Sequence, residues 1–333
     1  MSILQLKNCN LQTQPDLSQS QATRLSFSGN SIAAFFTEYL PPNLEYLDLG
    51  NNYLADDGIP FVLPDSIEEL LLDSNTIHHL DGIHWPQSLR KLMLDNNCIR
   101  AVPEGLPNTL EKLSVRHTNI LQIHTLPPTL KELIINFTLL NKLPRRIHLE
   151  VLEAHTNHIH SIGLPFDWGM RLRILNLSNN RLTQFPSNLP ESLEQLHLQY
   201  NQIEVVPSLP SNLQVLTIGY NKVKTIVFKK RKTPLTYVQL TNNQLTFSVL
   251  EVQISHPEHI WARSVDESHN WSNITYHLTS NLIKRVWRRY RLKKTLRAWL
   301  KTARVKEELI SIAMHPSRYG QFEDISSMTV LSQ

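Results

Sequence analysis

The apolar and polar positions of this 333-residue chain follow one pattern, Leu-x-x-Leu-x-Leu-x-x-Asn-x-Leu, which occurs twelve times. The Asn positions of successive copies lie 19 to 23 residues apart, from Cys9 to Asn243. Repetition at a nearly fixed period indicates a fold in which similar units stack on one another. Clear copies place their second and third leucine positions and their Asn at Leu47/Leu49/Asn52, Leu70/Leu72/Asn75, Leu92/Leu94/Asn97, Leu175/Leu177/Asn180, Leu196/Leu198/Asn201, Leu216/Ile218/Asn221 and Val238/Leu240/Asn243. Weaker copies centre on Leu25/Phe27/Asn30 and Leu152/Ala154/Asn157, and three copies carry Cys9, Thr118 or Thr138 in place of the Asn.

The Leu-x-Leu centre of each copy predicts a short β-strand. Successive side chains of a strand point to opposite faces, so both leucines should enter a shared core while the residue between them faces outward on a concave surface. The Asn comes where the chain leaves the strand, and its amide can pair with backbone groups that would otherwise be buried unpaired. Stacked copies should therefore align these side chains in a ladder, to which Cys and Thr contribute part of the bonding.

The prolines define how most copies begin. Leu-Pro pairs stand at Leu40-Pro41, Leu63-Pro64, Leu106-Pro107, Leu126-Pro127, Leu189-Pro190 and Leu209-Pro210. Proline prevents helix formation at this point, and a unit of about 21 residues is short. We therefore predict an extended or polyproline-like convex side and a stack consisting mainly of parallel strands. Twelve strands at ~4.8 Å spacing would form an arc roughly 50 Å long.

These residues resemble leucine-rich repeats of the short, proline-containing kind. The segment Leu189-Pro190-Glu191-Ser192-Leu193-Glu194-Gln195-Leu196-His197-Leu198-Gln199-Tyr200-Asn201-Gln202-Ile203 is similar to the repeats of secreted bacterial effectors of the Yop and Ipa type. Similar repeats occur in proteins of giant amoeba-infecting, mimivirus-like DNA viruses, and residues 312–320 are similar to C-terminal ends of giant-virus proteins. The resemblance covers residues 1–245 and implies a leucine-rich-repeat solenoid, with a viral source.

The end of the periodicity predicts four parts of the chain. Residues 1–245 form a solenoid of about twelve repeats, and residues 246–280 are expected to cap its open end, because an uncapped solenoid exposes its core. Residues 281–312 are predicted to form a basic amphipathic α-helix and 313–333 a tail. Residues 281–306 carry 11 Lys/Arg and no Asp/Glu, so the remainder holds 33 − 11 = 22 basic against 29 acidic residues, a net charge of −7.

The basic segment leaves four interpretations open. It could bind an acidic calmodulin-like protein, nucleic acid or an anionic membrane surface, or it could dock on the acidic repeats of its own chain. Its spacing is similar to that of an IQ-type motif, but Lys284 replaces the central glutamine. Two tryptophans on one face favour a protein groove or intramolecular docking over phosphate contacts alone. The candidate contact residues are Arg285, Trp287, Arg288, Arg289, Arg291, Lys293, Lys294, Arg297 and Trp299.

Function within the solenoid is expected on the outward residues of the strands, since the inward ones pack the core. The candidate partner-binding residues are Leu71, Met93, Arg116, His117, Ile134, Phe137, His155, His197, Tyr200 and Tyr220, and Glu153 faces outward in the same frame. Exposed apolar side chains tend to mark binding sites, although the apolar ones here could instead contact neighbouring repeats. Tyr200 and Tyr220 should stack about 4.8 Å apart, either as contact anchors or as a structural aromatic ladder.

Other chemistry is not expected. The histidines of 155–160 and 256–259 should not converge on a metal, so we predict neither metal nor cofactor. Two cysteines are too few for a disulfide framework and favour a reducing compartment. Residues 246–333 contain no cysteine, which excludes the thioester chemistry of effector-type ubiquitin ligases, and no phosphate loop, Gly-x-Ser-x-Gly or His-Glu-x-x-His motif occurs. The chain also lacks a signal peptide and an apolar run of about 18 residues, so Asn-x-Ser/Thr matches carry no weight.

Together these observations predict a non-enzymatic, intracellular and cytoplasmic scaffold, in a host cell or a virion. Its concave strand face would recognise a viral or host protein, and the basic C-terminal helix would be a second contact. The alternative is a nucleic-acid-associated or calmodulin-like-regulated protein that acts through residues 281–306.

Overall fold

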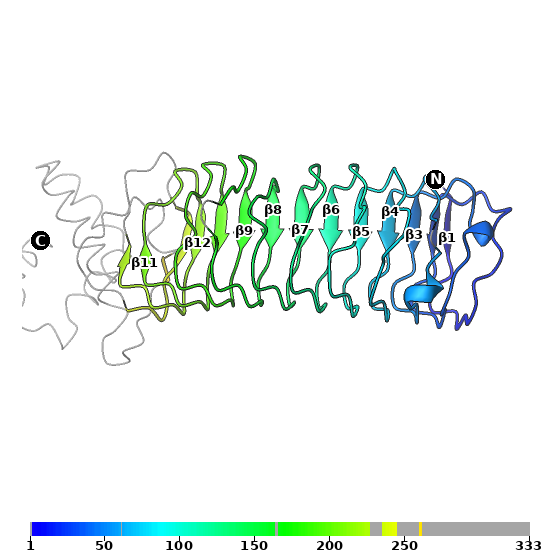
Figure 1. Cartoon of the computed structure of the whole chain (residues 1–333), viewed down its shortest axis with the longest axis horizontal. Helices are drawn as coiled ribbons and strands as arrows, with labels where there is room; N and C mark the ends of the chain where they lie inside the picture. Colours follow the sequence, from blue (N-terminus) through cyan, green and yellow to red (C-terminus); the bar gives the residue numbers. More distant parts are fainter. Residues whose placement is uncertain (1, 61, 164–165, 227–234, 245–259, 262–333) are drawn as a thin grey trace, which may run out of the picture.

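The computed structural model is an elongated solenoid, and thirteen strands among its described residues pair in parallel, nearly in chain order (Figure 1). It describes residues 2–60, 62–163, 166–226, 235–244 and 260–261. The strands of this sheet are β1 (Ile3–Gln5), β2 (Arg24–Ser26), β3 (Tyr46–Asp48), β4 (Glu69–Leu71), β5 (Lys91–Met93), β6 (Lys112–Ser114), β7 (Glu132–Ile134), β8 (Val151–Glu153), β9 (Ile174–Asn176), β10 (Gln195–His197), β12 (Val215–Thr217), β14 (Tyr237–Gln239) and β15 (Ile260–Trp261).

The predicted alternation of leucines sets the register of the sheet. In strands β2 to β10, β12 and β14 the middle residue, such as Leu70, Leu92 or Leu175, is buried and lies opposite its equivalent in the next strand. The leucine-type residue two positions later is buried in the same core. Because equivalent positions face each other, each repeat covers the apolar face of its neighbour, and one continuous core runs through the molecule.

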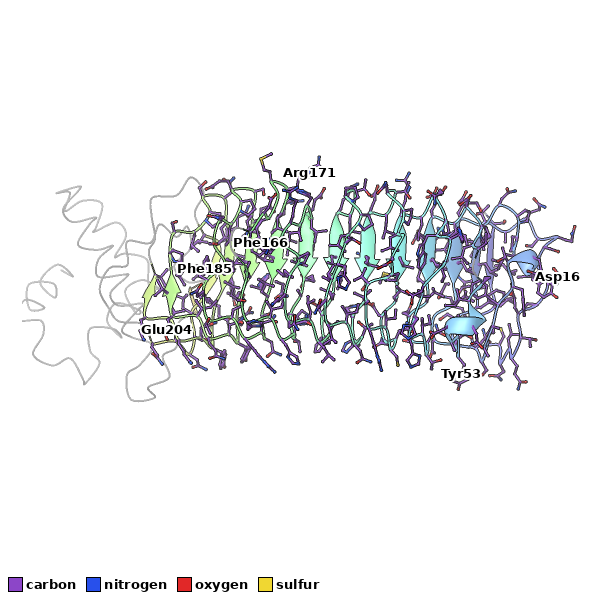
Figure 2. All side chains as sticks on the ribbon, viewed as in Figure 1. Asp16, Tyr53, Phe166, Arg171, Phe185 and Glu204 are labelled. Carbon is purple, nitrogen blue, oxygen red and sulfur yellow. The ribbon has the colours of Figure 1, made fainter. Side chains whose placement is uncertain are left out.

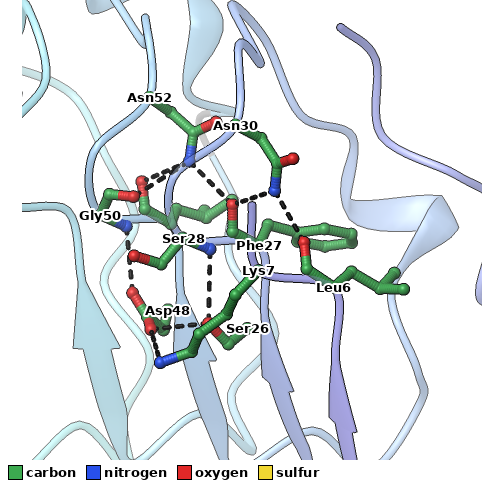
Figure 3. A network of polar contacts seen from close by, with 10 residues as sticks. Leu6, Lys7, Ser26, Phe27, Ser28, Asn30, Asp48, Gly50 and Asn52 are labelled. Atoms are coloured by element: carbon green, nitrogen blue, oxygen red, sulfur yellow. Dashed lines mark hydrogen bonds and ion pairs between the residues drawn. The ribbon is translucent and has the colours of Figure 1, made fainter. Parts of the chain in front are cut away.

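The predicted asparagine ladder is present along one edge of the core. Asn52 Nδ2 donates to the carbonyls of Leu49 in its own repeat and Phe27 in the preceding one, both at 3.1 Å (Figure 3). Its Oδ1 accepts the N–H of Ile32 at 3.0 Å. One side chain thus satisfies buried backbone groups of two repeats. Thr118 supplies only part of this bonding, since its hydroxyl donates to Val115 O at 2.8 Å within its own repeat.

The convex side is extended, as the Leu-Pro pairs predict. Among the described residues it contains a two-stranded pair, β11 (Val205–Val206) with β13 (Thr225–Ile226), and two 3-10 turns, η1 (Thr37–Tyr39) and η2 (Asp56–Gly58). The carbonyl of a repeat's proline accepts an N–H from the residue three positions later, as in Pro107–Leu110 and Pro190–Leu193, both at 3.1 Å. These turns direct the chain into the following strand.

The predicted solenoid of parallel strands is therefore confirmed, with about 11 turns against the twelve repeats counted in the sequence. The part of the chain that the structure describes contains no α-helix. The basic segment 281–312 and the tail lie outside it, so the C-terminal basic helix is unsupported and stays a prediction. Strand β15 pairs in parallel with β14 and lies within residues 246–280, where we expected a cap.

Candidate interaction surface

Each repeat bends away from its strand at the residue before the Asn position. The backbone of this residue is left-handed in all twelve repeats, with φ between +52° and +56° except at Gly29, where φ is +74°. Asn, Gly, Ser or Thr occupies eight of these positions, and Asn and Gly adopt this conformation readily. The other four hold ring side chains, namely His117, Phe137, Tyr200 and Tyr220.

The position of these rings corrects the sequence analysis. We expected Arg116, His117, Phe137, His155, Tyr200 and Tyr220 on the strands, but each strand is only two or three residues long and ends before them. The chain leaves the sheet once the second core leucine has entered the interior. The rings consequently lie along the edge where the strands end.

The four rings form two stacked pairs. Tyr200 and Tyr220 lie 4.3 Å apart at 13° between ring planes, and their side chains are 53% and 42% exposed. His117 and Phe137 lie 4.4 Å apart at 10°, while His155 meets Phe137 edge-on at 5.0 Å. The predicted stacking of the tyrosines is thus confirmed as geometry. A role of any ring in binding remains a prediction.

Three apolar candidates lie in one row of the sheet. Leu71 on β4, Met93 on β5 and Ile134 on β7 are half-buried and face the concave side, with the buried Ser114 of β6 between the last two. His197 on β10 is half-buried, and its Nδ1 lies 2.8 Å from Thr217 Oγ1. These four residues lie on strands, as predicted.

Charges on the outward positions of β2 to β7 are mostly paired between repeats. Arg116 donates Nε and an Nη to one oxygen of the buried Asp95 at 2.9 and 2.7 Å. Lys7 contacts Asp48 at 3.2 Å, and the Ser26 hydroxyl donates to the same carboxylate (Figure 3). Other pairs are Arg24–Glu69, Lys91–Glu69 and Lys112–Glu132. Asp73 forms no ion pair within the described residues, and its pKa is raised chiefly by burial and also by the neighbouring Asp48 and Asp95.

The later strands carry titratable groups of a different kind. Burial lowers the pKa of His197, and burial together with His117 and Arg116 lowers that of His155. Burial raises the pKa of Glu153, although Asn176 Nδ2 donates to its carboxylate at 2.7 Å. Both imidazoles are therefore mostly neutral at pH 7, because their pKa values lie below the ordinary 6.5.

The structure also bears on the metal, cysteine and membrane features considered in the sequence. Among the described residues no group of three His, Cys, Asp or Glu side chains converges on a metal position. Cys9 and Cys98 are free thiols. In the same part of the chain no helix has the length and apolar character needed to cross a bilayer.

Sequence reasoning missed apolar residues on the concave face. Val151, Ile174 and Val215 are half-buried and begin β8, β9 and β12, one position before the first core leucine. They lie on the same face as the residue between the leucines, because strand positions two apart share a face. Applying the period of two on both sides of the first leucine would have found them.

Comparisons with known proteins agree with this architecture. The family model described as Leucine Rich Repeat matches residues 43–65 and 171–191. Mouse podocan is 27% identical over 270 residues, covering 67% of this chain and 44% of podocan, and chicken lumican is 30% identical over 193 residues, covering 55% and 52%. YopM from Yersinia enterocolitica superposes with a TM-score of 0.59 at 27% identity, covering 72% of this chain and 50% of YopM. The chain spans about half the length of these relatives, or less.

Two expectations change with these relatives. Podocan, lumican and keratocan are secreted extracellular-matrix proteoglycans, which points to secretion and contradicts the intracellular, cytoplasmic location. That prediction relied on the first residues of the chain and on its low cysteine content, and neither decides the location of the protein. The giant-virus resemblance is not shown, whereas the effector-type resemblance is. The comparisons and the fold together support a leucine-rich-repeat protein whose repeats resemble those of YopM.

Proposed function

We propose that this chain is a non-enzymatic scaffold that recognises a protein partner on its concave face and on the adjoining ring edge. Solenoids of this fold typically mediate protein–protein interaction. The contact residues would be the candidates named above, chiefly the apolar row of Leu71, Met93 and Ile134 and the two stacked ring pairs.

The observation that carries the proposal is the identity of residues in the left-handed positions. A bulky side chain there costs roughly 1–2 kcal/mol relative to glycine, whereas most repeats use small or Asn side chains. Stacking stabilises each ring pair by about 0.5–1.5 kcal/mol, and this single gain has to offset the backbone cost of both residues in the pair. Fold stability alone therefore does not favour these rings, and residues that break a local rule concentrate at functional sites.

The test is affinity capture from secretions and extracts of the native cell with the full chain as bait. A Tyr200→Asn/Tyr220→Asn variant places at both positions the residue that five other repeats use. The matched control is Tyr53→Ala, since Tyr53 is 63% exposed and belongs to the β3 repeat, toward the other end of the solenoid from the tyrosine pair (Figure 2). We expect specific proteins that Tyr53→Ala retains and the double variant loses. If all three baits recover the same proteins, Tyr200 and Tyr220 do not anchor the partner.

We propose the basic segment 281–306 as a second contact with the protein partner. The alternative is that the chain acts through this segment on nucleic acid or under regulation by a calmodulin-like protein. Its 11 Lys/Arg without Asp/Glu, against a net charge of −7 for the remainder, support an electrostatic role. Binding of duplex DNA and of calmodulin should be measured with the full chain and with residues 281–306 deleted. A segment-dependent DNA affinity that falls steeply with salt supports the nucleic-acid alternative. The partner is proposed to be a viral or host protein, and the identity of the captured proteins tests this.

A further inference from the structure

The concave side divides into two halves of different charge. The segments 24–29, 46–51, 69–74, 91–96, 112–117 and 132–137 of the β2 to β7 repeats contain nine Asp, Glu, Lys or Arg residues. The equivalent segments 151–156, 174–179, 195–200 and 215–220 of the β8, β9, β10 and β12 repeats contain one, Glu153. We call the outward residues of these last four segments the neutral face.

The neutral face is nearly uncharged at pH 7 in spite of its titratable groups. His155 and His197 have lowered pKa values, so both are mostly neutral at this pH. Glu153 has a raised pKa and is bound by Asn176, so this single carboxylate is already engaged. The face has no Lys or Arg to pair with phosphate, sulfate or carboxylate groups.

Its side chains are nevertheless suited to binding. Val151, Ile174 and Val215 supply half-buried aliphatic surface, and the Tyr200–Tyr220 pair stands at the edge. The face therefore offers aliphatic and aromatic surface with neutral polar groups.

Building on the proposed function, we propose that the neutral face binds an uncharged segment of a protein partner. The occupant has no Lys, Arg, Asp or Glu where it crosses the face, because a buried charge would find no counter-ion there. It places an apolar or aromatic side chain against the tyrosine pair. Tyrosine is enriched among the hot spots of protein interfaces, and charged residues are depleted at the interface core.

The experiment uses a phage-displayed library of random 16-residue peptides, selected on the full chain and counter-selected on Tyr200→Asn/Tyr220→Asn. Peptides that depend on the tyrosines are expected to be poor in charged residues and rich in aromatic or aliphatic ones. Their affinity, measured by fluorescence polarisation, should change less than about twofold between 50 and 500 mM NaCl, since there are few charges to screen. Tyr53→Ala serves as the control for folding and exposure.

A pair of opposite substitutions then tests neutrality directly. Gln195 is half-buried on β10 in the middle of the face, so Gln195→Lys and Gln195→Glu place either charge at one position. Both should weaken the selected peptides by about tenfold or more, because either charge loses water on binding without gaining a partner. An uncharged occupant is contradicted if one substitution strengthens binding and the other weakens it.

Further outcomes separate this inference from the proposed function. A parallel selection without the counter-selection supplies the comparison. If it yields only peptides that bind the double tyrosine variant as well as the parent but are lost in Met93→Ala or Ile134→Ala, the neutral face is overturned and the scaffold is left intact. Tyrosine-dependent binding of neutral oligosaccharides on a glycan array, without tyrosine-dependent peptides, would overturn the assignment to a protein segment. Tyrosine-dependent peptides rich in Lys/Arg or in Asp/Glu would overturn it as well.

Discussion

At the scale of the residue, the left-handed position before each Asn shows how one backbone constraint separates structural from functional side chains. The backbone must turn there in every repeat, so φ stays near +55° whatever the side chain. Asn at Asn51 or Asn179 satisfies that geometry at little cost, whereas Tyr220 does not. A ring at this position consequently has to be explained by what it contacts.

Replacing Tyr220 by Asn should leave the free energy of unfolding within about 1 kcal/mol of the parent, because lost stacking is offset by relief of the left-handed backbone. Urea unfolding followed by circular dichroism measures this change. Leu216→Ala in the same repeat is the comparison, with an expected loss of about 2–5 kcal/mol from the buried core. A loss of more than about 2 kcal/mol in Tyr220→Asn would show that the ring pair is mainly structural.

His197 should make stability depend on pH. Its pKa is lowered in the folded state by burial, so the stabilisation is fully present above the unfolded pKa of about 6.5 and is lost as the pH falls below it toward the folded value. His155 acts in the same direction, whereas the raised pKa of Glu153 opposes both on acidification. Urea unfolding at pH 7.5 and 5.5 should show a smaller difference for His197→Asn than for the parent, and an equal difference would contradict this assignment.

At the scale of the element, each strand is so short that the Asn ladder is needed to fix the register between neighbouring strands. A three-residue strand cannot hold its register alone, since a shift by one residue would turn its leucines outward. Each Asn fixes its own repeat against the preceding one through three backbone groups, as Asn180 does with Ala154, Leu177 and Ile159. The ladder therefore locks the register that the leucines favour.

Two opposite changes test the ladder. Asn180→Ala should destabilise the protein by about 1–3 kcal/mol, because it leaves buried backbone groups unpaired. Thr118→Asn should stabilise it by about 1 kcal/mol, because Asn reaches the carbonyl of the preceding repeat, where Thr118 bonds only to Val115. Melting temperatures from scanning calorimetry distinguish them, and a lower value for Thr118→Asn would indicate that the site has no room for the amide.

At the scale of the whole molecule, stacking makes the solenoid nearly one-dimensional, so a repeat is stabilised by its two neighbours. The repeats of β4 to β9 have a partner on both sides, whereas β1 pairs only with β2 among the described strands. Leu4, Leu6, Leu11 and Leu17 are accordingly only partly buried, and Ile3 is largely exposed. Stability should fall toward this end of the molecule (Figure 1).

Native-state hydrogen exchange should show that gradient. The amide of Leu6, bonded to Ser26 O at 2.8 Å, is expected to exchange at least about tenfold faster than that of Leu94, bonded to Ser114 O at the same distance. The two bonds are alike, so the difference would report the missing neighbour. Equal protection factors would contradict the one-dimensional description.

The sequence by itself determined the repeat, its period, the parallel strands, the extended convex side and the Asn ladder. These follow from periodicity, because a residue type that recurs every turn must occupy equivalent positions, and Leu, Asn and Pro each suit only a few environments. The stacking of Tyr200 on Tyr220 followed from the same equivalence.

Only the tertiary structure decided which outward residues share a surface and how their charges pair. The strands end sooner than the pattern indicated, which places Phe137 and the tyrosines on the edge and not on the sheet. Residues some 20 positions apart become neighbours by stacking, so Arg116 neutralises Asp95 and the β8 to β12 repeats form one nearly uncharged face. Such properties belong to pairs of residues brought together across repeats, and a periodic pattern specifies the position of a side chain without specifying its contacts.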